Sequence, residues 1–404
     1  MKRSILFLEQ QSWLSGGQRM LETVLNTVVE EYDPVVAFPG DGPFRRALDE
    51  RNIQTLTVPL GFYQTGPKSR SEMLEFAGRS LLCALKLATV IRRREIELVY
   101  INGPRCLAAG VLAARLTGRP SLFHLHLTLT RQPEIFLAQR VARYASAIVA
   151  CSQAAAASIA GADPHLAGKT QVLYNPMARC PGEVFGSLEP EQIQSASRVF
   201  TLGVVGRITK PKGQRVFLNA LGRLGPQLKN RIRVIFIGAP SPDDREDLTY
   251  KQRLEECVTQ FNLQTKVEWA GYQKSVGPFY RAMDVLIHPS LLQSGEAMPL
   301  AVLEALQHGV PVIASWTGGI PEVVRHGANG LLVPPGDEVA LARALERFLQ
   351  DASLRARLRM GAQSNLDDRF SPENFNSKVH EQIWKLCSGQ DAKKSKVIRE
   401  ESTA

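Results

Sequence analysis

Cysteine is scarce in this 404-residue chain, and its spacing fits neither a metal site nor a disulfide framework. The six cysteines are scattered and form no Cys-x-x-Cys pair, so buried thiols are the expected state. A long apolar run is also lacking, since no stretch approaches the ~20 residues of a membrane-spanning helix. The first residues run straight into a strand pattern, without the features of a secretion signal. We therefore expect a cytoplasmic protein.

Positive charge is in excess, with a net charge of +10. This excess predicts an anionic partner. The sequence has no zinc-finger spacing and no RNA-binding aromatic motif, which disfavours nucleic acid. Phosphates of a small ligand and an anionic membrane surface both fit. Residues 61–94, with Phe62 and Tyr63, include a basic, partly apolar helix suited to peripheral membrane contact or to a lipid-linked acceptor. A solvated face with an ordinary buried stripe is the alternative.

The N-terminal part of the chain alternates apolar strands with amphipathic helices. Residues 4–8 have the continuous apolar character of a buried parallel strand, and a glycine turn then leads into apolar residues at helical spacing. Further predicted elements are strands at residues 98–101, 121–125 and 147–150 and a helix at residues 108–116. This alternation predicts a doubly wound α/β domain.

A second α/β series follows a stretch rich in Pro, Gly, Ser and Glu at residues 176–198, where we place the linker. Its predicted strands are residues 200–205, 234–237, 267–269, 285–288 and 310–314. The predicted domains are residues 1–185 and 186–370. A helix over 371–388, with Ser371 as its N-cap and Pro372 in its first turn, is expected to cross back to the first domain. Residues 389–404 are expected to form a disordered tail.

Two glutamates lie around a predicted helix start in the second series. Glu296 stands in the loop before the helix, and Glu304 lies eight residues later, about two turns along. Pro299 suits the first helical position. Such a loop lies at the carboxyl edge of a parallel sheet, where ligands bind, and the helix N-terminus favours an anion. A carboxylate beside that anion suggests hydrogen bonding to sugar hydroxyls; a solvated glutamate and an ordinary helix residue are the alternative.

The spacing Glu296-x7-Glu304, followed by Ala305 and Gly309-Val-Pro-Val312, resembles the signature of family 4 glycosyltransferases. The resemblance extends from the Ser15-Gly16-Gly17 loop to the final helix, with several motifs in the same order. It implies the GT-B fold, in which two Rossmann-like domains with parallel sheets face a central cleft. The N-terminal domain would bind the acceptor and the C-terminal domain the nucleotide sugar.

The resemblance also implies a role for each matching residue of the second domain. Glu304 would bind the ribose hydroxyls, and Glu296 would contact hydroxyls of the donor sugar. Arg207 and Lys212, in the loop that begins at Gly206, would grip the diphosphate. There is also an independent physical reason to expect two cations in this loop, because they would stabilise the charge that develops on a leaving diphosphate. The donor site would also include the amides of Met298, Pro299 and Leu300.

In the first domain the matching residues are two glycines, a histidine and an asparagine. Gly16 and Gly17 precede a helix and would allow close approach to a phosphate or sugar, although a simple tight turn also explains them. His124 and His126 follow a strand, and alternation places both on one face. We favour His126 as the one beside the donor sugar, because it lies nearer the strand end. Asn175 matches the segment before the linker.

A metal ion is not expected, because Asp243-Asp244 is not an Asp-x-Asp motif and no other Mg²⁺ or Mn²⁺ ligand set is evident. The predicted activity is retaining, metal-independent transfer of a hexose-type sugar from a UDP- or GDP-sugar to a hydroxyl acceptor, in glycan, polysaccharide or glycolipid synthesis. No cofactor is expected. The alternatives are a nucleotide-sugar epimerase of the same fold and a non-catalytic sugar-nucleotide-binding protein. A dehydrogenase is disfavoured, because no Gly-x-Gly-x-x-Gly follows a predicted strand.

Overall fold

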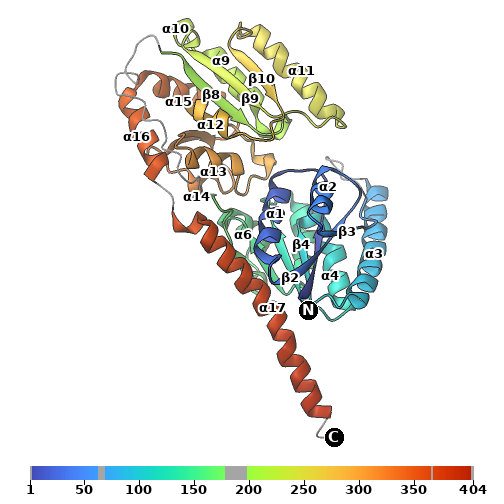
Figure 1. Cartoon of the computed structure of the whole chain (residues 1–404). Helices are drawn as coiled ribbons and strands as arrows, with labels where there is room; N and C mark the ends of the chain where they lie inside the picture. Colours follow the sequence, from blue (N-terminus) through green and yellow to red (C-terminus); the bar gives the residue numbers. More distant parts are fainter. Residues whose placement is uncertain (1, 62–68, 178–197, 365–366, 402–404) are drawn as a thin grey trace. The chain divides into compact units, whose positions relative to one another are not determined.

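The computed structural model describes residues 2–61, 69–177, 198–364 and 367–401. The chain divides into two compact units: unit 1 is Met1–Asn175 with Glu373–Ala404, and unit 2 is Pro176–Pro372. The predicted boundary at residues 185/186, like Phe62 and Tyr63, lies outside the described residues. Figure 1 shows the elements of each unit along the chain.

Unit 1 is built on a seven-stranded parallel sheet with the order β3-β2-β1-β4-β5-β6-β7. Its strands are β1 (Arg3–Glu9), β2 (Tyr32–Phe38), β3 (Gln54–Thr57), β4 (Leu98–Asn102), β5 (Ser121–Leu125), β6 (Ala147–Ala150) and β7 (Thr170–Val172). The chain builds outward from β1 to β3 and then returns to β4 on the other side of β1. The expected doubly wound topology is therefore confirmed, with its switch point between β1 and β4.

Helices cover both faces of this sheet (Figure 1). They are α1 (Gly16–Val28), α2 (Pro43–Glu50), α3 (Arg70–Arg93), α4 (Leu107–Leu116), α5 (Gln132–Ala142), α6 (Gln153–Ala160) and α7 (Pro164–Ala167). Right-handed crossovers place α1 and α2 on one face and α3 to α6 on the other, because the strand order reverses at β4. Strands covered on both sides read as continuous apolar runs, and Ile5, Leu6, Phe7 and Leu8 of β1 are accordingly fully buried.

The final helix, α17 (Pro372–Glu401), packs its first turns on unit 1. Asn376 and His380 hydrogen-bond Thr27 of α1, and Gln382 donates to Gln171 of β7 at 2.6 Å. The helix continues to Glu401, into the stretch expected to be a disordered tail. Ala, Lys, Arg and Glu are frequent there, and their high helix propensity accounts for the longer helix.

Unit 2 has a six-stranded parallel sheet with the order β10-β9-β8-β11-β12-β13. Its strands are β8 (Phe200–Val205), β9 (Ile232–Ile237), β10 (Val267–Gly271), β11 (Val285–His288), β12 (Val312–Ser315) and β13 (Gly330–Val333). Its helices are α9 (Gln214–Arg223), α10 (Pro226–Lys229), α11 (Arg245–Gln260), α12 (Gly277–Ala282), α13 (Leu300–Gln307), α14 (Ile320–Val323), α15 (Glu338–Gln350) and α16 (Ala352–Ser364). The switch point lies between β8 and β11, and a buried core of aromatic and aliphatic side chains joins the sheet to α9 and α15.

Candidate functional site

The candidate site of unit 2 forms where the carboxyl ends of β8 and β11 meet. Strand β8 ends at Val205 and leads into the loop with Arg207 and Lys212, and β11 ends at His288, before the loop with Glu296. The two strands are parallel neighbours at the switch point, which is where ligands bind in open α/β sheets. The topology thus brings together residues that are 84 positions apart in the sequence.

Gly213 allows these two loops to approach closely. Its φ is +70°, and a Cβ atom added to it would lie 2.0 Å from the backbone oxygen of Pro289. Only glycine fits such a contact without moving one of the loops. The position immediately before it is Lys212, so the close packing holds the lysine against the loop that begins at β11.

Glu296 is the centre of this contact, and its side chain is 8% exposed. Its Oε1 atom is contacted by Lys212 Nζ, accepts a hydrogen bond of 2.9 Å from Ser290 Oγ, and lies 3.4 Å from His288 Nε2. Burial opposes the charge on Glu296, but the Lys212 ammonium and the hydrogen bonds from His288 and Lys212 outweigh it and lower the pKa of the carboxyl. Glu296 is therefore an ionised hydrogen-bond acceptor at neutral pH.

Helix α13 begins directly after this loop, with Pro299 as its N-cap residue. The proline therefore stands one position earlier than expected, just outside the helix. Because proline has no N–H, only Met298 and Leu300 bring backbone donors to this segment, and the predicted role of the Pro299 amide is wrong. The glycine turn before α14 supports the same loop, since Gly319 N donates to Glu296 O at 3.3 Å.

Glu304 lies within α13, partly buried. Its Oε2 atom accepts a hydrogen bond of 2.9 Å from the hydroxyl of Tyr280 in α12. The side chain of Glu304 is therefore held in a fixed position on the surface of the helix. The sequence pattern gave no indication of Tyr280, because the contact joins two helices with no characteristic spacing.

Arg207 has a different partner from Lys212. Its Nε atom lies 3.9 Å from Oδ2 of Asp247 in α11, and its side chain is 55% exposed, whereas that of Asp247 is buried. Arg207 is therefore oriented by a weak ion pair and keeps about half of its side chain in solvent. Asp244, in the acidic pair considered for a metal, is the N-cap of α11 and accepts hydrogen bonds from the amides of Glu246 and Asp247.

The matching residues of unit 1 also gather at a switch point, that of β1 and β4. Gly16 and Gly17 are in the first turn of α1, with Ser15 as the N-cap, rather than before the helix as expected. His126 Nε2 and Asn102 Oδ1 are 2.7 Å apart, and Asn102 Nδ2 donates to the buried Glu9 at 2.5 Å. Glu9 and Asn102 each end a strand, so the carboxyl-edge rule applied to every strand would have found them.

The two histidines after β5 have different surroundings. Their rings are in contact, with centroids 3.8 Å apart and planes tilted by 42°, but His124 is fully buried and contacts the hydroxyl of Tyr100. His126 is partly exposed and lies beside Gly17. The geometry thus favours His126 over His124 for contact with a ligand. Asn175, at the end of unit 1, is buried.

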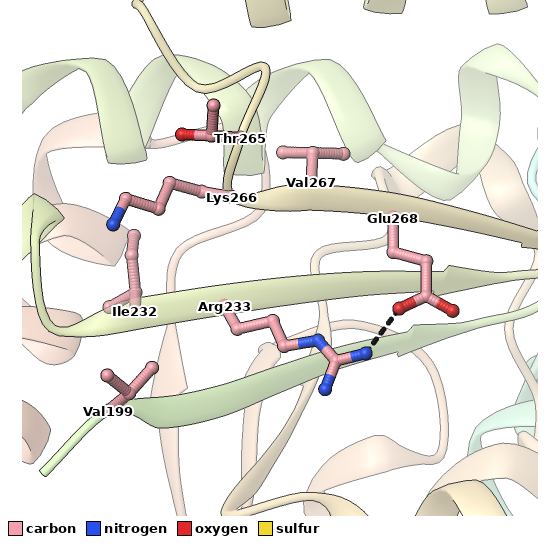
Figure 2. A pocket seen from close by; sticks show the side chains of 7 residues that line it. All are labelled: Val199, Ile232, Arg233, Thr265, Lys266, Val267 and Glu268. Carbon is pink, nitrogen blue, oxygen red and sulfur yellow. Dashed lines mark hydrogen bonds and ion pairs between the residues drawn. The ribbon is translucent and has the colours of Figure 1, made fainter.

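A surface hollow of ≈ 320 Å³ lies elsewhere on unit 2 and does not belong to the candidate site. Figure 2 shows its lining, including the ion pair of Arg233 and Glu268 at 2.5 Å. It is formed at the starts of β8, β9 and β10, the edge opposite the loops with Lys212 and Glu296. Among the described residues, no group of three or more His, Cys, Asp or Glu side chains is arranged to hold a metal ion.

Two doubly wound units with parallel sheets are the architecture of the GT-B class of α/β proteins. Two family models match the chain in order: a glycosyl transferase 4-like domain over residues 16–176, and glycosyl transferases group 1 over residues 188–365. The chain therefore belongs to family 4 of the glycosyltransferases.

Solved structures and curated relatives agree with this assignment. Anabaena Alr3699/HepE in complex with UDP and glucose is similar with a TM-score of 0.75 at 25% identity, over 94% of this chain and 98% of that chain. D-inositol 3-phosphate glycosyltransferase of Stackebrandtia nassauensis is 29% identical over 253 residues, which is 59% of this chain and 55% of that protein. Human alpha-1,3/1,6-mannosyltransferase ALG2 is 28% identical over 212 residues, 50% of each chain. The chain spans about half the length or less of the curated relatives it matches.

Proposed function

We propose that this protein transfers a hexose-type sugar from a nucleoside-diphosphate sugar to a hydroxyl acceptor, with retention of the anomeric configuration and without a metal ion. The observation that carries the proposal is the ion pair of Glu296 and Lys212 at the switch point of unit 2. An ionised carboxylate and an ammonium side by side match a ligand with sugar hydroxyls next to a diphosphate.

The state of Glu296 defines what it does in this reaction. Its lowered pKa makes it a poor general acid, and an ionised carboxylate accepts hydrogen bonds from hydroxyls. Glu296 therefore orients the donor sugar, with Ser290 and His288 holding its Oε1 atom. Glu304, fixed by Tyr280, binds the ribose hydroxyls at the other end of the donor.

The cations act on the leaving group. As the bond to the anomeric carbon breaks, the electron pair goes to the diphosphate, and positive charge near its oxygens lowers the barrier. Lys212 is already held by Glu296, and the more exposed Arg207 turns from Asp247 to the phosphates. The acceptor hydroxyl attacks from the face that the diphosphate leaves, and a phosphate oxygen takes its proton. A carboxylate nucleophile is not needed in this scheme.

The donor is a UDP- or GDP-sugar, and the UDP complexes of the Anabaena structures support UDP as the first to test. The relative named for D-inositol 3-phosphate supports an acceptor with a sugar-like hydroxyl, and the one named for mannosyl transfer supports a hexose donor. We extend the acceptor to lipid-linked sugars, as in glycan or glycolipid synthesis.

The test is incubation of the purified protein with labelled UDP- and GDP-sugars. Sugar transfer, or slow donor hydrolysis that is insensitive to EDTA, supports the proposal, and the anomeric coupling of the product by NMR reports retention. An epimerised donor supports the isomerase alternative. Binding without any turnover supports a non-catalytic protein instead, and a requirement for added Mg²⁺ or Mn²⁺ overturns metal independence.

We also propose that unit 1 contacts an anionic membrane through α3. In the described part of the chain, no helix is long and apolar enough to cross a bilayer. Helix α3, beside α4 in Figure 1, instead exposes apolar residues at helical spacing together with basic ones. Five large apolar side chains of α3 are about half exposed or more: Met73, Leu74, Leu81, Leu82 and Leu85. Exposed basic residues of the same helix are Arg79, Lys86, Arg92 and Arg93.

Flotation with vesicles tests the membrane proposal. Binding to phosphatidylglycerol vesicles at low salt, and not to phosphatidylcholine, is expected, because the helix combines apolar and cationic side chains. Leu82→Asp with Leu85→Asp should weaken binding by about tenfold or more, from the loss of ~0.8 kcal/mol per buried methylene. Met360→Asp, at a side chain 66% exposed in unit 2, is the matched control. A protein that stays in the supernatant at low salt contradicts the proposal.

A further inference from the structure

Glu9, Asn102 and His126 form a chain of hydrogen bonds at the switch point of unit 1. Glu9 and Asn102 are opposite each other in the parallel register of β1 and β4. Oε1 of Glu9 accepts from the backbone amides of Gln10 and Gln11 and from Nε2 of Gln18, at 2.7, 3.1 and 2.7 Å. Oε2 accepts from Asn102 Nδ2 at 2.5 Å. Both oxygens of the ionised carboxylate are therefore occupied by donors, and these hydrogen bonds favour the charge against burial, which raises the pKa of Glu9 to about 7.

The orientation of the Asn102 amide is set by two acceptors. Its Nδ2 atom lies 3.3 Å from Gly17 O as well as 2.5 Å from Glu9 Oε2. A backbone oxygen can only accept, so the amide nitrogen must face it and Oδ1 must face the other way. That other side is occupied by His126 Nε2 at 2.7 Å.

The state of His126 follows from this orientation. Because Asn102 Oδ1 accepts, Nε2 of His126 must carry the proton. Burial lowers the pKa of His126 to about 4, so the ring is neutral at physiological pH and has a single N–H. Nδ1 is then a hydrogen-bond acceptor. It is covered and has no hydrogen-bond partner among the described residues, so the loss of its contact with water is not offset until a donor reaches it.

We propose that Glu9 and Asn102 are positioning residues that fix His126 in its Nε2–H tautomer, so that Nδ1 accepts a hydrogen bond from a hydroxyl of the donor sugar. The part that concerns the sugar rests on the proposed function, whereas the tautomer follows from the hydrogen bonds alone. Gly17 contributes in two ways. Its carbonyl orients the Asn102 amide, and its lack of a side chain leaves space beside the ring of His126. A Cβ atom added to Gly17 would lie 3.8 Å from Cδ2 of that ring.

Glu9→Gln is the informative variant, because it keeps the shape and reverses the chain of hydrogen bonds. The amide oxygen of the new side chain must take the Oε1 position, where two backbone amides point. Its NH₂ group then faces Asn102, and the Asn102 amide turns so that Oδ1 accepts from it. The turn gives up the longer contact of Nδ2 with Gly17 O at 3.3 Å in favour of the shorter one on the side of residue 9. Nδ2 then faces His126 Nε2, which becomes the acceptor, and the proton moves to Nδ1.

The ¹⁵N chemical shifts of protein labelled with ¹⁵N-histidine report which ring nitrogen of His126 carries the proton. The His126→Gln variant identifies the signals of this residue, because they are missing from its spectrum. The wild type should show a protonated Nε2 and an unprotonated Nδ1 at His126, and Glu9→Gln should exchange the two. Asn102→Asp should keep the wild-type tautomer, because its carboxyl shares one proton with Glu9 and still accepts from His126. Glu97→Gln removes a carboxylate at the opposite edge of the sheet and should leave the tautomer of His126 unchanged. Nδ1–H in the wild type, or no exchange in a folded Glu9→Gln protein, overturns the proposal.

Kinetics with deoxy analogues of UDP-glucose test the link to the sugar. For the wild type, removal of the hydroxyl that contacts Nδ1 should lower kcat/KM by about tenfold, the value of one neutral hydrogen bond. Glu9→Gln should lose this discrimination while its Kd for UDP stays unchanged. Equal discrimination in both proteins overturns the role at the sugar. Absence of turnover in the wild type counts against the proposed function, and the ¹⁵N spectra still decide the tautomer.

Discussion

Removal of the Lys212 ammonium should expose how strongly unit 2 depends on the pair it forms with Glu296. Lys212→Met keeps most of the side-chain volume and takes the ammonium away from Glu296, which is 8% exposed and keeps its contacts with Ser290 and His288. Breaking a fully buried ion pair costs about 3–5 kcal/mol. The Lys212 side chain is 29% exposed, so solvent screens part of the attraction and we expect about 2–3 kcal/mol.

The loss should depend on pH in a direction set by Glu296. Its pKa is lowered in the folded protein, so the pair contributes its full stability above the unfolded pKa of about 4.3 and loses it as the pH falls toward the folded value. In Lys212→Met, burial is no longer outweighed and the pKa of Glu296 should rise. The stability difference between wild type and variant should therefore be largest at pH 7 and narrow toward pH 4.

Hydrogen exchange measured by mass spectrometry reports the stability of each unit separately. The free energy of opening is taken from peptides of β8 and β11, corrected for the intrinsic exchange rate at each pH. Lys210→Met, which removes an exposed charge from the same turn, is the matched control and should have little effect. Equal protection in wild type and Lys212→Met, or a loss that is the same at pH 4 and pH 7, would refute the reasoning.

Four further variants test single residues. Tyr280→Phe removes the hydrogen bond that holds Glu304, and calorimetry should show UDP binding about fivefold weaker, ~1 kcal/mol; unchanged affinity would place the ribose elsewhere. Arg207→Ala should lower turnover by about 10–100-fold with an unchanged melting temperature, because the role proposed for this exposed arginine is to stabilise the leaving diphosphate; a lowered melting temperature would indicate a structural role. His124→Ala should destabilise unit 1 by about 2–3 kcal/mol in urea unfolding, since the ring is fully buried, whereas His126→Ala should mainly slow transfer; the reverse pattern would exchange their roles.

The fold was predictable to the extent that its strands are continuous apolar runs. Residues 121–125, 147–150, 200–205 and 285–288 are strands with the predicted bounds. The strand Tyr32–Phe38 was missed, because it begins with polar residues and contains Pro34. The final helix was predicted too short, since apolar periodicity ends before the helix does.

The site was predictable where a motif fixes two residues on one loop or helix, as with Glu296 and Glu304. The partners that hold the candidate site residues are elsewhere in the chain. Glu296 is contacted by Ser290, just after β11, Glu304 by Tyr280 on α12, and Arg207 by Asp247 on α11. Contacts of this kind depend on which strands become neighbours, and a single sequence does not state the strand order. Glu9 and Asn102 are 93 positions apart and meet only because β4 returns to the side of β1.

The close packing at Gly213 has a consequence for engineering the donor preference that we propose for this protein. Any side chain at this position would push the loop with Lys212 away from Pro289, and with it the ammonium from Glu296. Libraries that aim at a new sugar should therefore vary Met298 and Leu300 and leave Gly213 fixed. Selection for a different donor would then change the side chains around the sugar, while the ion pair of Lys212 and Glu296 keeps its geometry.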